Sequence, residues 1–154
     1  MTEIKLNLAY LTTVEGLLQS GQIILGVLFC CLVGVFCHGG VCRAGSAEGQ
    51  SFVLFVGSLC IICSCVFLIS KLIDAQHSVR APWFKMELIY HSVAAVLYVI
   101  AASVEAYYAS GAESLRGSAT EVIYAQWVAV TVFGWLIVAL YVIYAVLLFL
   151  DSRK

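Results

Sequence analysis

Residues 122–150 read VIYAQWVAVTVFGWLIVALYVIYAVLLFL, and this stretch contains no charged side chain. As a helix it would be roughly 43 Å long, which exceeds the bilayer hydrocarbon core of about 30 Å. A helix of this length must tilt or project from the membrane. The stretch therefore predicts that the chain is an integral membrane protein.

Further apolar runs precede this one, and each is long enough to cross a bilayer as a helix. The expected spans are residues 17–36, 51–73, 88–109 and 122–150. The first run is longer than the apolar core of a signal peptide, so we expect it to be kept as a span. Short connections favour antiparallel neighbours. We expect an all-α membrane protein in which residues 1–154 form a single domain, a four-helix up-down transmembrane bundle.

The composition supports this interpretation and excludes one class of partner. Hydrophobic residues make up 63% of the chain and charged residues 11%, whereas soluble domains carry about 25% charged residues. The net charge is −1 and the chain has no basic tract, so we expect no nucleic-acid partner.

The distribution of Lys and Arg predicts the orientation of the bundle. If both termini are cytoplasmic, the outer loops contain only Arg43 and Arg116. The tails and the middle loop then contain Lys5, Lys71, Arg80, Lys85, Arg153 and Lys154. The positive-inside rule therefore favours cytoplasmic N- and C-termini.

The chain has seven cysteines, and they suggest a disulfide more than a metal site. Cys37 and Cys42 flank a glycine-rich outer loop in an oxidising compartment, so they are candidates for a disulfide. With His38 they offer three zinc ligands where a structural site takes four, so we expect no metal and no other cofactor. The Cys-x-x-Cys spacing of residues 60–63 lies inside an apolar span and lacks the context of a redox motif.

The beginning of the first span combines a capping signal with small residues. Thr12 or Thr13 would cap the helix, and Glu15 would lie in its first turn. Gly16 and Ser20 form a small-xxx-small pair that permits close helix contact. Both packing within the bundle and self-association remain open for this pair.

Residues 74–85 are expected to form a cytoplasmic loop that includes Pro82, the single proline of the chain. Trp83 and Phe84 lie next to Lys85, a combination suited to the headgroup level. The segment is either a docking site for a cytosolic partner or a plain connector.

The third span contains a polar stripe of Glu87, His91, Tyr98 and Glu105. Their offsets of four, seven and seven positions place them on one helix face. Ionisable groups inside a membrane normally face the bundle interior or water. We expect Glu87 to begin the helix and Glu105 to lie near the outer interface.

Three interpretations of the stripe remain open. The first is a buried network that fixes helix register, with Gln22, Thr131 or Gln126 as candidate partners. The second is a groove that contacts lipid or sterol. The third is a path for ions or protons. The chain shows no broken helices or internal repeats of the kind that transporters use.

An enzyme is not expected. Hydrolysis requires a nucleophile within reach of a base, or a metal ion. Ser92 follows His91 directly, but adjacent positions on a helix do not face each other.

The third span also resembles a known family. Residues 90–98 (YHSVAAVLY) and 101–106 (AASVEA) are similar to the third span of the MARVEL family, especially the branch of myelin-and-lymphocyte protein and plasmolipin. Residues 10–13 (YLTT), 16–18 (GLL) and 24–26 (ILG) resemble the first helix of that family and of its chemokine-like-factor branch. The cysteines inside the spans do not match the family, and they leave the branch open.

The resemblance implies a non-enzymatic tetraspan protein that organises membrane and lipid domains and supports vesicle trafficking or membrane apposition. Its implied partners are membrane lipids, including sterol- or sphingolipid-rich ones, other membrane proteins, and further copies of itself. Its implied location is the plasma membrane or vesicle membranes. The alternative function is a transporter, channel or channel accessory subunit that uses the polar stripe.

Overall fold

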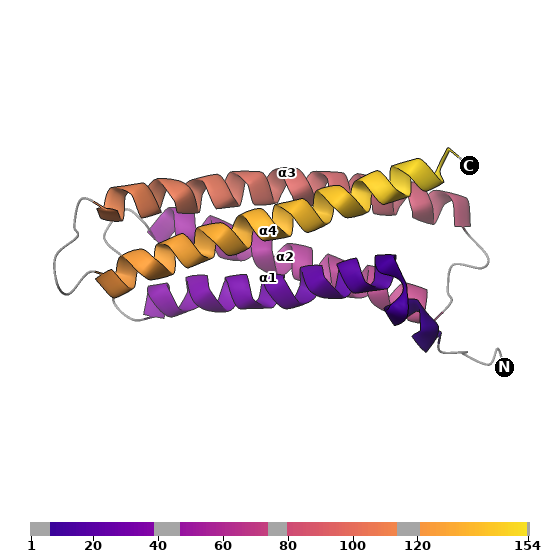
Figure 1. Ribbon diagram of the computed structural model, residues 1–154, viewed down its shortest axis with the longest axis horizontal. Helices are drawn as coiled ribbons and strands as arrows, with labels where there is room; N and C mark the ends of the chain where they lie inside the picture. Colours follow the sequence, from indigo (N-terminus) through magenta and orange to yellow (C-terminus); the bar gives the residue numbers. More distant parts are fainter. Residues whose placement is uncertain (1–6, 39–46, 74–79, 114–120, 154) are drawn as a thin grey trace.

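The chain is a bundle of long helices that run up and down side by side (Figure 1). The computed structural model describes residues 7–38, 47–73, 80–113 and 121–153. Its elements are the 3-10 helix η1 (Leu8–Thr12) and the helices α1 (Val14–His38), α2 (Ala47–Leu72), α3 (Arg80–Glu113) and α4 (Glu121–Asp151). Each of the four α-helices contains a segment long and apolar enough to cross a membrane. The predicted all-α bundle of four spanning helices is therefore confirmed.

Helix α1 begins three residues earlier than the apolar run suggested, because Thr13 caps it. The backbone N–H of Gly16 donates a hydrogen bond to Thr13 Oγ1 at 3.1 Å. This bond satisfies one of the amides that have no partner within the first helical turn. Glu15 lies in the same turn, where its charge suits the helix dipole. The predicted cap is confirmed.

Helix α3 begins at Arg80, so two expectations for this segment are wrong. The residues up to Lys85 belong to the helix and not to a loop. Pro82 is the third helical residue, and its missing N–H costs little because amides of the first turn lack a helical acceptor. Glu87 consequently does not begin the helix; it lies about two turns inside it, beyond the first-turn reach of the dipole.

Small residues allow the helices to approach closely in the centre of the bundle. A β-carbon on Gly134 of α4 would lie 3.0 Å from the Ala102 β-carbon of α3 and 3.3 Å from the Phe29 ring of α1. Phe29 and Ala102 are fully buried. Glycine at residue 134 therefore brings three helices together at one level, as membrane bundles do with small residues.

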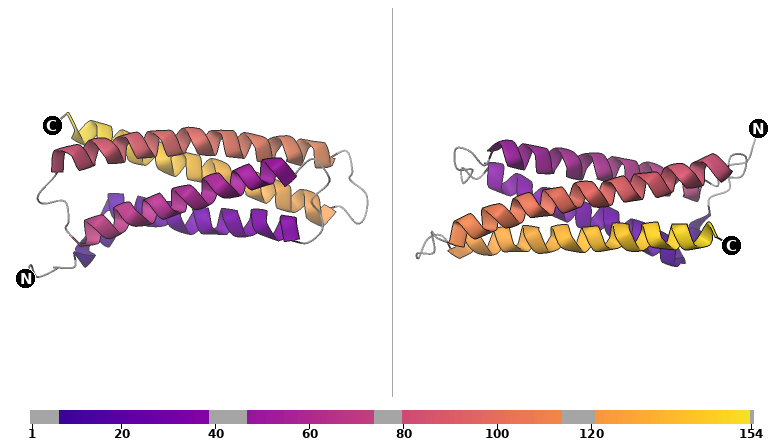
Figure 2. Two further views of the ribbon diagram at one scale, coloured as in Figure 1. Left: turned by 180° about the vertical axis from the view of Figure 1, so that it is seen from behind. Right: turned by 90° about the horizontal axis from the view of Figure 1, so that it is seen from above.

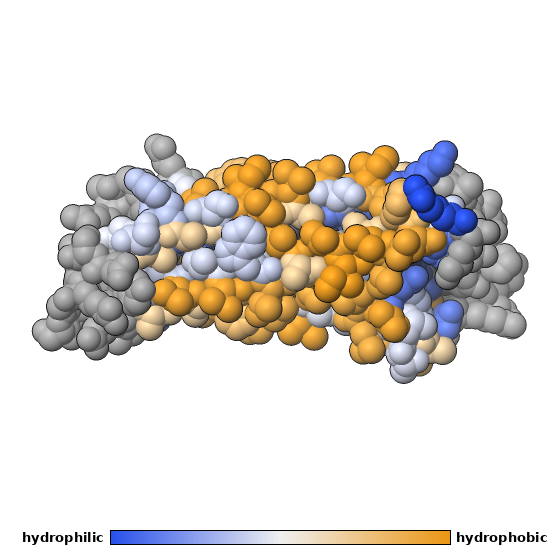
Figure 3. All heavy atoms as spheres, turned by 45° about the horizontal axis from the view of Figure 1, so that its top comes forward, coloured by the Kyte–Doolittle hydropathy of each residue, from blue (hydrophilic) through white to orange (hydrophobic). Residues whose placement is uncertain are grey.

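The outer surface is apolar over most of its length. Exposed side chains include Phe55 and Ile62 of α2, Ile89 and Val96 of α3, and Val132 of α4. Figure 3 shows this apolar surface over the middle of one face, with hydrophilic residues gathered at the end where α4 finishes. Figure 2 shows that η1, the end of α2 and the beginning of α3 lie at that same end. We call it the terminal end of the bundle.

Candidate functional site

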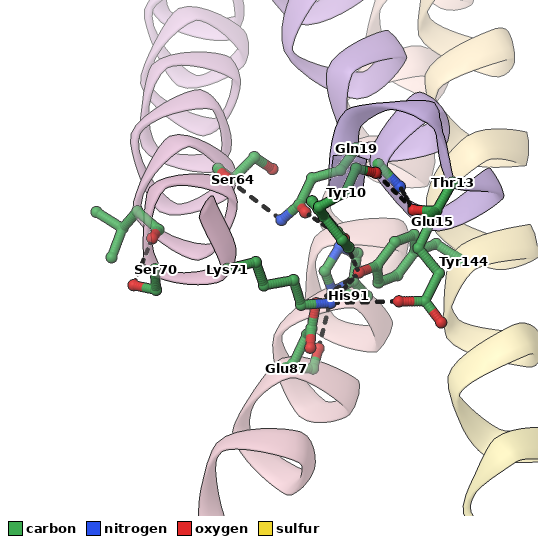
Figure 4. Close-up of polar contacts among 12 residues, drawn as sticks. Tyr10, Thr13, Glu15, Gln19, Ser64, Ser70, Lys71, Glu87, His91 and Tyr144 are labelled. Atoms are coloured by element: carbon green, nitrogen blue, oxygen red, sulfur yellow. Dashed lines mark hydrogen bonds and ion pairs between the residues drawn. The ribbon is translucent and has the colours of Figure 1, made fainter. Parts of the chain in front are cut away.

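A cluster of charged and aromatic side chains joins the helices near the terminal end (Figure 4). We call Tyr10, Glu15, Lys71, Glu87 and Tyr144 the terminal polar cluster. The Lys71 ammonium lies 2.6 Å from Glu87 Oε1 and 3.6 Å from Glu15 Oε2. It also donates a hydrogen bond to the Tyr144 hydroxyl at 2.6 Å, and that hydroxyl donates to Glu87 Oε1 at 2.6 Å. One cation therefore connects α2 to α1, α3 and α4.

The exposure of each side chain to water determines how strongly each ion pair of this cluster contributes. The Lys71 side chain is 8% exposed and that of Glu87 is 4% exposed, whereas that of Glu15 is 40% exposed. Water screens the Glu15 contact, so it contributes little. The Lys71–Glu87 pair is shielded, and each member would be costly to bury without the other. This pair is the central interaction of the cluster.

Helix η1 folds over the cluster through Tyr10. The Tyr10 hydroxyl donates a hydrogen bond to Gln19 Oε1 at 3.2 Å, and the Lys71 ammonium lies 5.3 Å from the centre of the Tyr10 ring. Burial raises the pKa of the Tyr10 hydroxyl above its ordinary value, so this group remains a neutral donor at physiological pH. The backbone N–H of Asn7 donates to the Leu72 carbonyl at 2.8 Å, which ties the N-terminal segment to the end of α2.

A second network lies deeper and centres on Ser64 of α2. Its hydroxyl lies 2.8 Å from the Tyr90 hydroxyl and 2.9 Å from the Tyr141 hydroxyl. Tyr90 donates its proton to the Cys60 carbonyl at 2.6 Å, so it accepts from its hydroxyl neighbours. The Gln19 amide donates to the Ser64 carbonyl at 3.4 Å. Side chains from all four α-helices therefore meet at Ser64.

His91 lies between the two networks. Its Nδ1 donates a hydrogen bond to the Glu87 carbonyl at 2.8 Å, and its ring stacks on Tyr144 with centroids 4.1 Å apart. Nε2 is buried and has no hydrogen-bond partner among the described residues. The ring therefore serves as a packed aromatic group that bonds to its own helix.

Tyr98 is fully buried about two turns beyond His91 along α3. Its ring stacks on Tyr141 with centroids 5.4 Å apart and meets the edge of Phe29 at 5.9 Å. Its hydroxyl has no hydrogen-bond partner in the described part of the chain. The chain of hydrogen bonds that starts at the terminal polar cluster therefore does not continue through Tyr98.

Glu105, the last residue of the stripe, is fully buried. The candidate partners expected from the sequence do not bond to it: Thr131 donates to the Trp127 carbonyl at 2.9 Å, and Gln22 donates to the Leu140 carbonyl at 3.3 Å. Gln50 of α2, which is also fully buried, lies beside the Glu105 carboxyl. Sequence reasoning missed Gln50 because it lies at the edge of an apolar run.

The structure thus brings all four stripe residues into the interior, with Glu87 3% exposed and the others 0% exposed. It does not bring them together as one network, because Glu87 and His91 share contacts that Glu105 lacks. Sequence reasoning also missed Lys71, Ser64 and Tyr144 as partners. The functional role of the stripe remains a prediction.

The small-residue pair of α1 is divided between two environments. Gly16 is buried, and a β-carbon there would collide with the Tyr10 carbonyl oxygen of η1. Its small size therefore makes room for the N-terminal segment of the same chain. Ser20 is half-buried, and self-association through this face remains a prediction.

The candidate disulfide lies outside what the structure describes: Cys42 falls in an undescribed segment, and the Cys37 side chain is not described. Among the described residues, Cys30, Cys31, Cys60, Cys63 and Cys65 are free thiols. Those residues also contain no group of three or more His, Cys, Asp or Glu side chains that could hold a metal ion.

Comparison with known proteins adds a family to this description. The sequence model of the MARVEL family, described as a membrane-associating domain, matches residues 10–147. The chain belongs to the MARVEL family. No curated protein and no solved structure matches it. The match over residues 10–147 includes every residue of the terminal polar cluster, from Tyr10 to Tyr144. A membrane-associating domain agrees with the four spanning helices and establishes a multi-pass membrane protein.

Proposed function

We propose that this MARVEL protein is a non-enzymatic organiser of membrane and lipid domains that supports vesicle trafficking or membrane apposition. It would act in the plasma membrane or in vesicle membranes, with both termini in the cytoplasm. Its partners would be lipids, including sterol- or sphingolipid-rich ones, other membrane proteins, and copies of itself.

The observation that supports this proposal is that polar side chains of the spans are buried within the core, whereas the exterior is mostly apolar. Buried polar side chains gather inside the bundle: Gln19, Gln22, Gln50, Ser64, Glu87, His91 and Glu105. Large apolar side chains cover the outside, and Phe55 and Ile62 are 66% and 61% exposed. A protein built in this way meets its surroundings within the bilayer through apolar contacts with lipid acyl chains and neighbouring helices.

The environment of His91 supports the non-enzymatic part of the proposal. Its neighbour Ser92 is exposed and donates a hydrogen bond to the Leu88 carbonyl at 2.8 Å. A serine nucleophile requires its base within hydrogen-bond reach. The Ser92 hydroxyl instead bonds to its own helix backbone, and the His91 Nδ1 bonds to Glu87.

The break at Tyr98 favours an organiser over an ion or proton path. A proton relay requires a continuous chain of donors and acceptors, and the Tyr98 hydroxyl has no partner among the described residues. The Lys71–Glu87 pair also neutralises two of the charges at the terminal end. We therefore assign the buried polar side chains the role of fixing the register between the helices.

Native mass spectrometry with lipid identification tests the proposal. The protein would be extracted under mild conditions, as wild type and as the exterior variants Phe55→Ala and Ile62→Ala. We expect oligomers that retain a restricted class of lipid, and reduced retention in at least one of these variants. Buried Val53→Ala provides a matched control on the same helix, because Val53 is 0% exposed and does not face lipid.

A parallel flux assay tests the alternative function, a transporter or channel. Wild-type protein in sealed vesicles would be given a pH gradient and a monovalent-cation gradient, with empty vesicles as control. We expect no flux above that of empty vesicles. A monomer without lipid preference that dissipates either gradient, and loses this activity in Glu105→Gln, would establish a transporter or channel instead.

A further inference from the structure

The two glutamates of the α3 stripe lie in opposite electrostatic environments. Glu87 is paired with Lys71 at 2.6 Å and accepts a hydrogen bond from Tyr144. Glu105 is 0% exposed, and neither of its carboxyl oxygens has a hydrogen-bond partner among the described residues. Gln50 is also 0% exposed, lies beside Glu105, and has an equally unpartnered amide. Four buried polar atoms from two helices therefore remain unsatisfied at one place.

The surroundings of Glu105 supply no counter-charge among the described residues. Gly134, Ala102 and Phe29 meet at one level of the bundle. One turn further from the terminal end, α4 and α1 present Val130 and Val33, both fully buried, at the level of Glu105. From α2 the neighbour is Gln50, and the titratable side chains of α3 nearest in sequence are Tyr107, which is 75% exposed, and Tyr108. The described lysine and arginine side chains belong to helix ends at the terminal end: Lys71, Lys85 and Arg153.

An ionised carboxylate in such a place would be very costly. A buried charge without a partner loses its hydration and gains no Coulomb attraction in return. A neutral carboxylic acid avoids this cost and acquires an O–H donor. The acid and the amide are then complementary, because the acid O–H donates to Gln50 Oε1 and Gln50 Nε2 donates to the acid carbonyl. Such a pair of hydrogen bonds would satisfy both groups.

We propose that Glu105 is buried as the neutral acid and pairs with the Gln50 amide, forming a clamp between α2 and α3 that holds only while the carboxyl keeps its proton. The same two helices are joined at the terminal end by the Lys71–Glu87 ion pair and at the other end by a protonated glutamate. Loss of the Glu105 proton places an uncompensated charge in the core. Raising the pH therefore releases α2 from α3 at the end remote from the termini, while the Lys71–Glu87 pair still holds the terminal end.

Infrared difference spectroscopy of the full chain in lipid vesicles tests the protonation state. We expect wild-type protein at neutral pH to show the C=O stretch of a protonated carboxyl, and Glu105→Gln to lose it. The double variant Lys71→Met/Glu87→Gln is the matched control, and the band should persist there because the Glu87 carboxylate is paired with the Lys71 ammonium in wild type. Absence of a band that depends on Glu105 would overturn the proposal. A Glu105→Gln chain that fails to fold would also overturn it, since the amide reproduces the shape and charge of the neutral acid.

A second variant tests the partner. Gln50→Leu keeps Glu105 and removes its hydrogen-bonding partner, so we expect the carboxyl band to shift toward that of a free acid. A band at an unchanged position would show that Gln50 is not the partner. Hydrogen exchange then tests the release: after correction for the intrinsic pH dependence of amide exchange, the protection of amides in the first half of α2 should fall at alkaline pH in wild type, and this fall should disappear in Glu105→Gln. Equal pH responses in the two proteins would overturn the clamp.

Discussion

The ammonium nitrogen of Lys71 lies 2.6 Å from a carboxylate oxygen of Glu87, and both side chains are more than nine-tenths buried. Burying either charged side chain alone would cost much free energy, because a charge that is removed from water needs an opposite charge close by. The pair also joins helices that are separated in sequence by the connection from α2 to α3. The stability of the bundle at its terminal end therefore depends on this contact.

Replacing Lys71 with Met should destabilise the bundle by about 3–5 kcal/mol, because Glu87 would be left as an unpaired buried charge. Unfolding of the purified protein in mixed micelles measures the change in free energy. The double variant Lys71→Met/Glu87→Gln should recover part of the loss. Lys85→Met is the matched control, since Lys85 is exposed and should cost little. Equal losses in the single and double variants would show that pairing is not the cause.

Ser64→Ala should cost less, roughly 0.6 kcal/mol and at most about 1.7 kcal/mol, the average and the maximum measured for hydrogen bonds between membrane helices. The variant removes the hydroxyl that lies within 2.9 Å of both Tyr90 and Tyr141. A double-mutant cycle with Tyr141→Phe isolates the contribution of one bond. Ser103→Ala serves as control, because Ser103 is exposed and bonds to the Val99 carbonyl of its own helix. Strict additivity in the cycle would contradict the network.

Gly16→Ala should displace η1, since the new methyl group would collide with the Tyr10 carbonyl oxygen. We expect a loss of about 1–3 kcal/mol, typical of overpacking, and faster hydrogen exchange in residues 8–12. Gly34→Ala is the matched control within α1, because a β-carbon there meets no atom within 4 Å. Similar effects of the two substitutions would mean that helix propensity, and not the contact with η1, determines the result.

The predicted orientation is tested by a glycosylation reporter. The chain has no natural acceptor sequence, since its single asparagine is followed by Leu8 and Ala9, so an added one gives a clean signal. A reporter inserted within residues 39–46 should acquire a glycan, and the same reporter after Lys154 should not. The reverse pattern would place the termini outside and contradict the assignment from Lys and Arg.

The fold could be predicted from the sequence because the hydropathy of a membrane span is a local property. The stripe was also accessible, since offsets of four and seven place Glu87, His91, Tyr98 and Glu105 on one face of any helix. The partners of these side chains could not be predicted, because the register between α2 and α3 depends on side-chain packing. Lys71 illustrates the difficulty: at the end of an apolar run it is indistinguishable from a loop cation that marks the cytoplasmic side.

The beginning of α3 was misjudged for a different reason. The expected span began at residue 88, where the apolar run begins, so Pro82 was assigned to the preceding loop. The first helical turn tolerates proline, because its amides have no acceptor within the helix. Position relative to the start of a helix decides the effect of proline, and a single sequence does not reveal where that start lies.

The helices of the bundle differ in length, from 25 residues in α1 to 34 residues in α3. At 1.5 Å per residue these correspond to roughly 38 Å and 51 Å of helix, and both exceed a hydrocarbon core of about 30 Å. The longer helix must therefore tilt further or project further from the bilayer than the shorter one. Lipid headgroups around this protein consequently meet helix ends at different heights on different sides of its circumference.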